Sequence, residues 1–141
     1  MKNISTLLTV LLSLLLSVAV ISSCNADSKT SKEVTDTVYT YEQISQKEAK
    51  ALMDSEKDYV ILDVRTTEEF AESHIKGAVL IPDYDIKSKA ETVLTDKDQL
   101  ILVYCRSGRR SKEAAGKLAK LGYTNIVEFG GILDYKGEIE K

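Results

Sequence analysis

The chain contains no tryptophan, one proline, one histidine and only two cysteines, Cys24 and Cys105, among its 141 residues. Two cysteines and one histidine without the close spacing of a ligand set argue against a zinc site. The formal net charge of −3 gives no basic surplus, so nucleic acid is not an expected partner. What remains is a small, mildly acidic chain whose length allows one domain.

The first 23 residues have the pattern of a secretory signal peptide. Lys2 is their only charged residue, and a leucine-rich apolar run covers residues 7–21. The run ends in Ile21-Ser22-Ser23-Cys24, which resembles the lipobox of bacterial lipoproteins, where the signal is cut before the cysteine and the cysteine carries lipid. An ordinary secretory signal and an uncleaved anchor helix are the alternatives. We expect residues 1–23 to be a lipoprotein signal peptide and Cys24 to anchor the protein to a membrane of the bacterial cell envelope, facing the periplasm or the surface.

The stretch after Cys24 differs in composition from both of its neighbours. Residues 24–36 are rich in serine, threonine, aspartate and lysine, which predicts a flexible tether to a domain spanning residues 37–141. Because lipid takes Cys24, Cys105 is the lone cysteine of that domain. A single thiol in an oxidising compartment has no internal partner for a disulfide.

Strand and helix patterns alternate along residues 37–141, which predicts an α/β fold with a mostly parallel sheet. Ser45 with Glu48, and Thr66 with Glu69, match capping boxes at two helix starts. Strands are predicted at 38–41, 59–64, 77–81, 100–104 and 126–129. Helices are predicted at 45–53, 66–73, around 86–94, at 112–121 and, briefly, after Gly130-Gly131.

A loop rich in arginine carries the most informative chemistry. Cys105 follows the apolar strand 100–104, and the helix after it begins near Ser111. Since sites in such sheets form beyond the carboxyl ends of strands, Asp63 is expected on the same rim. The helix N-terminus, the loop arginines and a backbone nest allowed by Gly108 all favour a thiolate, which is the nucleophilic form of cysteine. The loop residues after Cys105 are Arg106, Ser107, Gly108, Arg109 and Arg110.

The loop is one residue shorter than that of cysteine phosphatases. Those enzymes use the spacing C-x5-R, whereas here Ser111 stands six positions after Cys105 and Arg110 stands five after it. The smaller cradle suits the outer sulfur of a persulfide better than a phosphoryl group. A cysteine phosphatase or an arsenate reductase therefore remains the less favoured enzyme class.

Several segments together resemble the single-domain rhodaneses, a family of thiosulfate sulfurtransferases. They are Leu62-Asp63-Val64-Arg65, Glu69-Phe70, His74-Ile75-Lys76-Gly77-Ala78, Ile81-Pro82, Tyr104 to Ser111, and Gly130-Gly131. The resemblance implies a small, mostly parallel five-stranded sheet with helices on both faces. It also implies an enzyme that needs no cofactor and no metal, or else a non-catalytic module that carries sulfur or binds a partner.

The resemblance assigns roles to the loop and its surroundings. Cys105 would take sulfur from thiosulfate or a similar donor as a persulfide and pass it to cyanide or a thiol, with a thioredoxin-like reductant as one such acceptor. Arg106 and Arg109 would contact the substrate anion, with Ser107 and Gly108 completing the active loop. Arg110 would pin the loop, through Asp63, with Arg65 as a second supporting residue.

Two positions are expected to play minor parts. The only histidine, His74, is expected to be structural at the end of its helix rather than a general base. Tyr135 occupies the position where the family often has tryptophan, so an altered edge of the active pocket is expected there.

Overall fold

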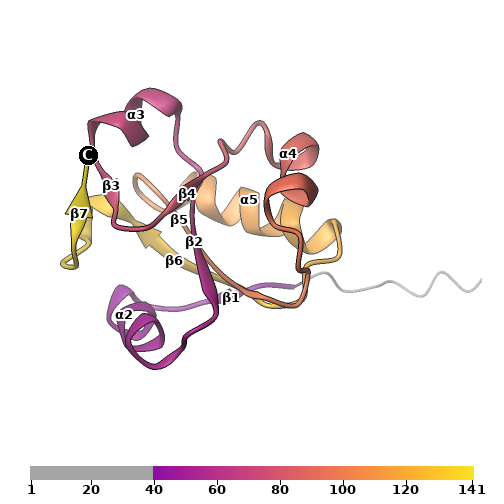
Figure 1. Ribbon diagram of the computed structural model, residues 1–141, viewed down its shortest axis with the longest axis horizontal. Helices are drawn as coiled ribbons and strands as arrows, with labels where there is room; N and C mark the ends of the chain where they lie inside the picture. Colours follow the sequence, from indigo (N-terminus) through magenta and orange to yellow (C-terminus); the bar gives the residue numbers. More distant parts are fainter. Residues whose placement is uncertain (1–39) are drawn as a thin grey trace, which may run out of the picture. The chain divides into compact units, whose positions relative to one another are not determined.

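The computed structural model describes residues 40–141, and they form a five-stranded parallel sheet in the order β1-β6-β5-β2-β4 (Figure 1). The predicted mostly parallel five-stranded sheet is thus confirmed. Its strands are β1 (Glu42–Gln43), β2 (Tyr59–Asp63), β4 (Val79–Leu80), β5 (Leu100–Cys105) and β6 (Ile126–Gly131).

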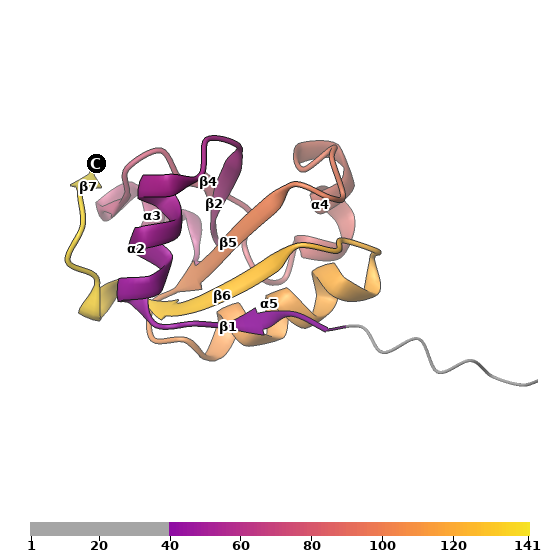
Figure 2. The same ribbon diagram turned by 90° about the horizontal axis from the view of Figure 1, so that it is seen from below.

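Helices cover both faces of this sheet (Figures 1 and 2). Helix α2 (Gln46–Ser55) packs on one face, over a core that includes Leu102, Tyr104 and Phe129. Helices α4 (Ile86–Val93) and α5 (Arg109–Lys120) pack on the other face, over a core that includes Val103. Successive residues of β5 therefore alternate between two apolar cores, because side chains of a strand point to opposite faces.

Both predicted capping boxes are present. Ser45 caps α2, and Thr66 caps α3 (Thr67–Glu72); in each case the glutamate at the third helical position returns a hydrogen bond to the cap backbone. These reciprocal bonds satisfy backbone N–H groups that a helix start would otherwise leave unpaired. In α3 the glutamate is Glu69, whose side chain accepts a hydrogen bond from the Thr66 backbone N–H. This hydrogen bond fixes the Glu69 side chain near the carboxyl end of β2.

Helix α5 begins earlier than the sequence predicted. Its N-cap is Gly108, which has φ +97, and the helix starts at Arg109 rather than near Ser111. Glycine adopts this left-handed conformation without the steric cost that other residues meet. The early start places Arg109, Arg110 and Ser111 in the first helical turn, directly behind the cysteine loop.

Two predictions near the chain ends need correction. The first strand was expected at 38–41, but β1 spans Glu42–Gln43 and pairs with β6; residues 38 and 39 lie outside the described range. The helix expected after Gly130-Gly131 is only the 3-10 turn η1 (Ile132–Asp134). The chain then extends into β7 (Ile139–Glu140), which pairs antiparallel with β3 (His74–Ile75). Backbone pairing with β3 outweighs weak helix propensity in this segment.

Among residues 40–141, no helix is long and apolar enough to cross a membrane. The predicted signal peptide, Cys24 and most of the predicted tether precede residue 40 and lie outside the described residues.

Candidate active site

Cys105 lies at the carboxyl end of β5, where the ladder between β5 and β6 becomes irregular. The register shifts between Val103 and Cys105, and Cys105 is then paired with Gly131. Its side chain is buried, and the backbone N–H of Gly108 donates to the sulfur at 3.1 Å. The sulfur therefore sits on the floor of the loop and faces an oriented N–H group.

Gly131 explains the Gly-Gly pair beside the loop. A Cβ atom at Gly131 would collide with the carbonyl group of Arg106. The backbone of β6 can therefore pass directly under the loop only if residue 131 has no side chain. Gly130 precedes it with φ +96, again a conformation that favours glycine. The two glycines are part of the loop's support and not only a chain turn.

The surroundings of Cys105 favour its ionised form. Burial raises the pKa of the Cys105 thiol, but hydrogen bonds from the Ser111 hydroxyl and from the N–H groups of Ser111, Ser107 and Gly108 more than offset this, so the pKa lies below its ordinary value. Hydrogen bonds to a charged acceptor are stronger than neutral ones, especially where water is excluded. The hydrogen-bond donors of the loop therefore favour the thiolate form of Cys105, which is the reactive form.

Arg110 does not reach Asp63, which corrects the predicted pairing. It forms two hydrogen bonds to Glu69, at 2.7 and 2.9 Å, and so ties the first turn of α5 to α3. The hydrogen bond from Arg110 is the main reason that the pKa of Glu69 falls to about 2. From the sequence, Glu69 was a capping residue and part of one resembling segment, but its pairing with Arg110 was not predicted because nothing in linear spacing shows that α3 and α5 meet.

Asp63 instead belongs to a separate buried network with Arg65. The Arg65 guanidinium donates to the Asp63 carboxylate at 2.6–3.0 Å and to the carbonyl of Ser73 at 2.7 Å. The Tyr104 hydroxyl also donates to Asp63 and accepts from the N–H of Ile75. Burial, followed by the bond to Asp63, strongly raises the pKa of Tyr104. This network joins the end of β2 to β5 and β3.

The remaining loop arginines face solvent. Arg106 and Ser107 are exposed, and Arg109 is exposed while paired with Glu113 one turn along α5 at 2.9 Å. Of the five loop residues after Cys105, Gly108 donates its N–H to the buried sulfur and Arg110 is held in a partly buried ion pair, whereas Arg106, Ser107 and Arg109 are exposed.

His74 has the surroundings of a structural residue. Its ring stacks on Phe70 with centroids 3.7 Å apart, and its Nδ1 lies 3.0 Å from the Phe70 carbonyl. Its Nε2 lies 3.5 Å from Glu140 of β7. The ring therefore links the end of α3 to the chain end, and its contacts do not involve the cysteine loop.

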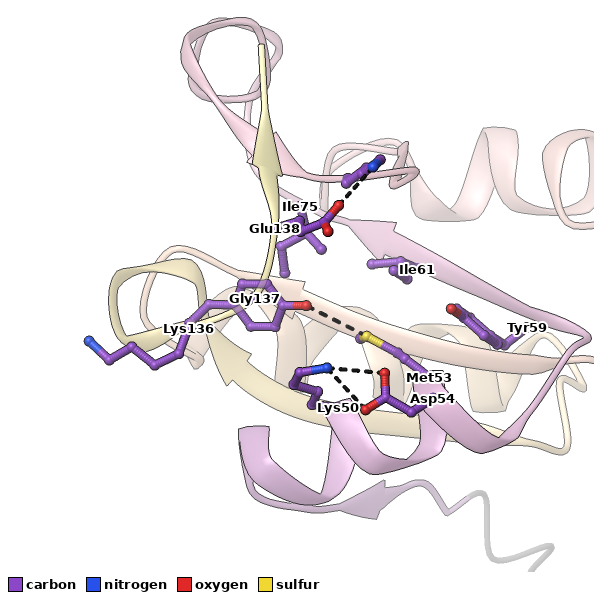
Figure 3. Close-up of a pocket in the computed structure, with 11 residues that line it drawn as sticks. Lys50, Met53, Asp54, Tyr59, Ile61, Ile75, Lys136, Gly137 and Glu138 are labelled. Atoms are coloured by element: carbon purple, nitrogen blue, oxygen red, sulfur yellow. Dashed lines mark hydrogen bonds and ion pairs between the residues drawn. The ribbon is translucent and has the colours of Figure 1, made fainter.

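Tyr135 lines a hollow on the α2 side of the sheet. Its ring packs near Phe129, and its hydroxyl contacts the sulfur of Met53 at 3.7 Å. The hollow has a volume of about 520 Å³ (Figure 3), and no residue from 105 to 111 lines it. The expected effect of Tyr135 on the edge of the active pocket stays a prediction, since the contacts of its ring and hydroxyl described here are with Phe129 and Met53.

Comparison with known proteins agrees with this geometry. The family model of the rhodanese-like domain matches residues 45–138. The chain belongs to the rhodanese-like family. The thiosulfate sulfurtransferase PspE of Escherichia coli K12, phage shock protein E, is 37% identical over 73 residues, which cover 52% of this chain and 70% of PspE.

Other relatives extend the likeness to other bacteria. The putative sulfurtransferase YtwF of Bacillus subtilis is 35% identical over 68% of this chain and 91% of YtwF. The putative sulfur carrier protein YrkF of the same species is 35% identical over 70% of this chain, which spans only about half of YrkF (52%). A solved structure described as rhodanese with anions from E. coli has a TM-score of 0.56 and 34% identity, covering 59% of this chain and 98% of that one. Membership in this rhodanese family supports sulfur transfer as the general activity.

Proposed function

We propose that the protein is a sulfurtransferase that carries sulfane sulfur as a persulfide on Cys105. The observation that carries the proposal is the Cys105 sulfur itself, buried on the loop floor with the Gly108 N–H at 3.1 Å and with a lowered pKa. A thiolate is the attacking species in sulfur exchange. The same N–H groups can hold the negative outer sulfur of a persulfide.

The reaction balances in two displacement steps. In the first, the Cys105 thiolate attacks the outer sulfur of thiosulfate, a new S–S bond forms, and sulfite leaves with the electron pair of the broken bond. In the second, an acceptor nucleophile attacks the outer sulfur, and Cys105 leaves as a thiolate. Leaving is faster when the departing thiol has a low pKa, so the loop contacts that lower this pKa assist both the start and the end of the cycle.

The arginines divide into two kinds. Arg106 and Arg109 are exposed, and surface pairs such as Arg109–Glu113 are weak, so both guanidinium groups are free to meet a donor anion such as thiosulfate. Arg110 is held by Glu69 and acts as a support of the loop. Guanidinium groups suit sulfonate-like oxygens because they offer several N–H donors in one plane.

The proposed cellular setting rests on the sequence alone. Residues 1–23 are proposed to be a cleaved signal, Cys24 the lipid anchor, residues 24–36 the tether and residues 37–141 the domain. With no second cysteine in the domain, the persulfide must be resolved by an external acceptor: cyanide, a small thiol or a thioredoxin-like reductant. Labelling of cells with a fatty-acid probe should mark this protein but not Cys24→Ala; equal labelling of both would contradict the anchor.

Thiocyanate formation from thiosulfate and cyanide is the direct test of the activity. The purified protein should turn over, and Cys105→Ser should not. Turnover that survives in Cys105→Ser, or that is absent from the unaltered protein, would contradict the catalytic proposal.

A non-catalytic sulfur carrier is the second candidate, favoured by the likeness to a relative named a putative sulfur carrier protein. A carrier would load sulfur on Cys105 but would release it only to a protein partner, with no turnover on cyanide. A phosphatase is disfavoured by the shorter loop, and hydrolysis of an aryl phosphate by the purified protein would reverse that judgement.

A further inference from the structure

The side chain of Gln46, the first residue of α2, reaches the strand that passes beneath the active loop. Its amide nitrogen Nε2 donates to the carbonyl oxygen of Gly131 at 2.6 Å. The start of α2 and the end of β6 therefore lie side by side (Figure 2). Since a backbone carbonyl can only accept a hydrogen bond, the contact requires the N–H donor of the Gln46 amide.

Gly131 is the point at which β6 meets both the nucleophile and the active loop. It pairs with Cys105 in the sheet, and a Cβ atom at position 131 would collide with the Arg106 carbonyl group and with the Cα atom of Ser107. The backbone of Arg106 and Ser107 therefore rests directly on Gly131. Close-packed interiors transmit small displacements, so the position of Gly131 determines the position of the loop.

The two successive glycines make this part of β6 the one that most needs to be held. Neither has a side chain that could pack against a neighbour, and glycine has the greatest backbone freedom of all residues. The Gly130 N–H is held from within β6, because it donates at 2.9 Å to Glu128, a residue buried beneath Ser111 and bonded to its hydroxyl at 2.6 Å. Gln46 holds the other glycine, Gly131, from a different element of the fold.

We infer that Gln46 is a positioning residue that fixes the Gly131 peptide and, through it, the active loop over Cys105. The inference rests on the proposed role of Cys105 as the nucleophile. The same loop brings the Gly108 N–H to 3.1 Å from the Cys105 sulfur, and a hydrogen bond weakens steeply as its angle departs from linearity. A loop whose support moves therefore stabilises the thiolate less.

Gln46 is not needed to begin α2. The helix is already capped by Ser45, with Glu48 returning a hydrogen bond to the cap backbone. The positive end of a helix also favours an acidic residue in the first turn. Gln46→Glu should therefore preserve the helix while it removes the N–H donor, which separates the contact to Gly131 from any role in the stability of α2.

The test is the pH dependence of Cys105 alkylation by iodoacetamide in the full chain, measured by mass spectrometry of the Cys105 peptide so that Cys24 does not contribute. Gln46→Glu and Gln46→Met both remove the donor at nearly constant volume, and Gln46→Met adds no charge. The alkylation midpoint should rise by about 0.5 to 1 pH unit in both variants, which is the size of one hydrogen bond to the thiolate. The urea midpoint of Gln46→Glu should not fall.

A matched control is available at the opposite end of β5. Gln99 lies just before that strand, and its amide donates to Asp58 in an exposed contact. Gln99→Met removes this contact and should leave the alkylation midpoint and the thiocyanate rate unchanged. In the two Gln46 variants, kcat/KM for thiosulfate should fall by about tenfold, because small misplacements of reacting groups are costly.

Three results would overturn the inference. They are an unmoved alkylation midpoint in Gln46→Met, a shift confined to Gln46→Glu, which its added charge explains, and a urea midpoint of Gln46→Glu that falls together with its activity. Alkylation needs no sulfur transfer. An unaltered protein that forms no thiocyanate would therefore refute the sulfurtransferase proposal, whereas the alkylation midpoints would still decide the role of Gln46.

Discussion

Two arginine–carboxylate pairs lie on the same rim of the sheet, and they differ in burial. Asp63–Arg65 is almost wholly buried, with exposed side-chain fractions of 0% and 5%, whereas Glu69–Arg110 keeps 23% and 19%. The first joins strands within the scaffold, and the second ties a helix to the active loop. The comparison suggests that the scaffold depends on the buried pair and that the loop's position depends on the more accessible one.

Removing one partner of the buried Asp63–Arg65 pair should destabilise the protein more than any other change predicted here. Asp63→Asn leaves the Arg65 guanidinium buried without its counter-charge, which should lower the free energy of unfolding by about 3–5 kcal/mol. Urea unfolding followed by circular dichroism measures this. Asp54→Asn, in an exposed ion pair with Lys50, is the control. If Asp63→Asn lowered the free energy of unfolding no more than Asp54→Asn does, the buried pair would not stabilise the packing of β2 against its neighbours.

Breaking the accessible pair should affect catalysis more than stability. In Glu69→Gln, Arg110 loses its ionic partner, and the loop shifts relative to α3. Small misplacements of reacting groups cost up to about a hundredfold in rate, so we expect kcat/KM for thiosulfate to fall by about tenfold or more. Glu72→Gln at the end of the same helix is the control, and equal activity of the two variants would refute the supporting role of Glu69.

The same pair predicts how stability changes in acid. The folded-state pKa of Glu69 is about 2, below the ordinary value of 4.5. A depressed pKa means that the stabilisation is complete above about 4.5 and is lost as the pH falls towards 2. Stability measured across this window should therefore decline less steeply in Glu69→Gln than in the unaltered protein. Parallel curves for the two proteins would show that the pair does not contribute to acid sensitivity.

The smallest change in stability and in activity is expected for the Lys76–Glu138 ion pair. Lys76 and Glu138 form an ion pair at 2.7 Å beside β3 and β7, but both side chains are largely exposed. Exposed pairs contribute little because solvent screens them. Lys76→Met should leave the urea midpoint and the thiocyanate rate unchanged, and a clear loss of either would mean that the β3–β7 pairing supports the site.

Much of the fold was predictable because its signals are local. Both capping boxes depend on residues three apart, residues 100–104 form a continuous apolar run, and residues 59–64 are apolar except for Asp63. The loop chemistry was also visible in one contiguous segment. These features need no knowledge of which elements meet in space.

The contacts that differ from the prediction depend on tertiary packing. Asp63 and Glu69 are both acids near the same strand end, and sequence spacing cannot tell which one Arg110 meets. Glu128 lies in an apolar strand and carries no motif, so its burial beneath Ser111 emerges only from the register of β6 against β5 and the position of α5. The C-terminal segment was given a helix because its pairing with β3 joins residues distant in sequence.

The central claim is that Cys105 carries sulfur, and intact-mass measurement of the purified protein after exposure to thiosulfate tests it most directly. A gain of about 32 Da that maps to Cys105, disappears on treatment with cyanide and is absent from Cys105→Ser is the expected result for a persulfide. An unchanged mass after thiosulfate, or the same gain in Cys105→Ser, would contradict the account.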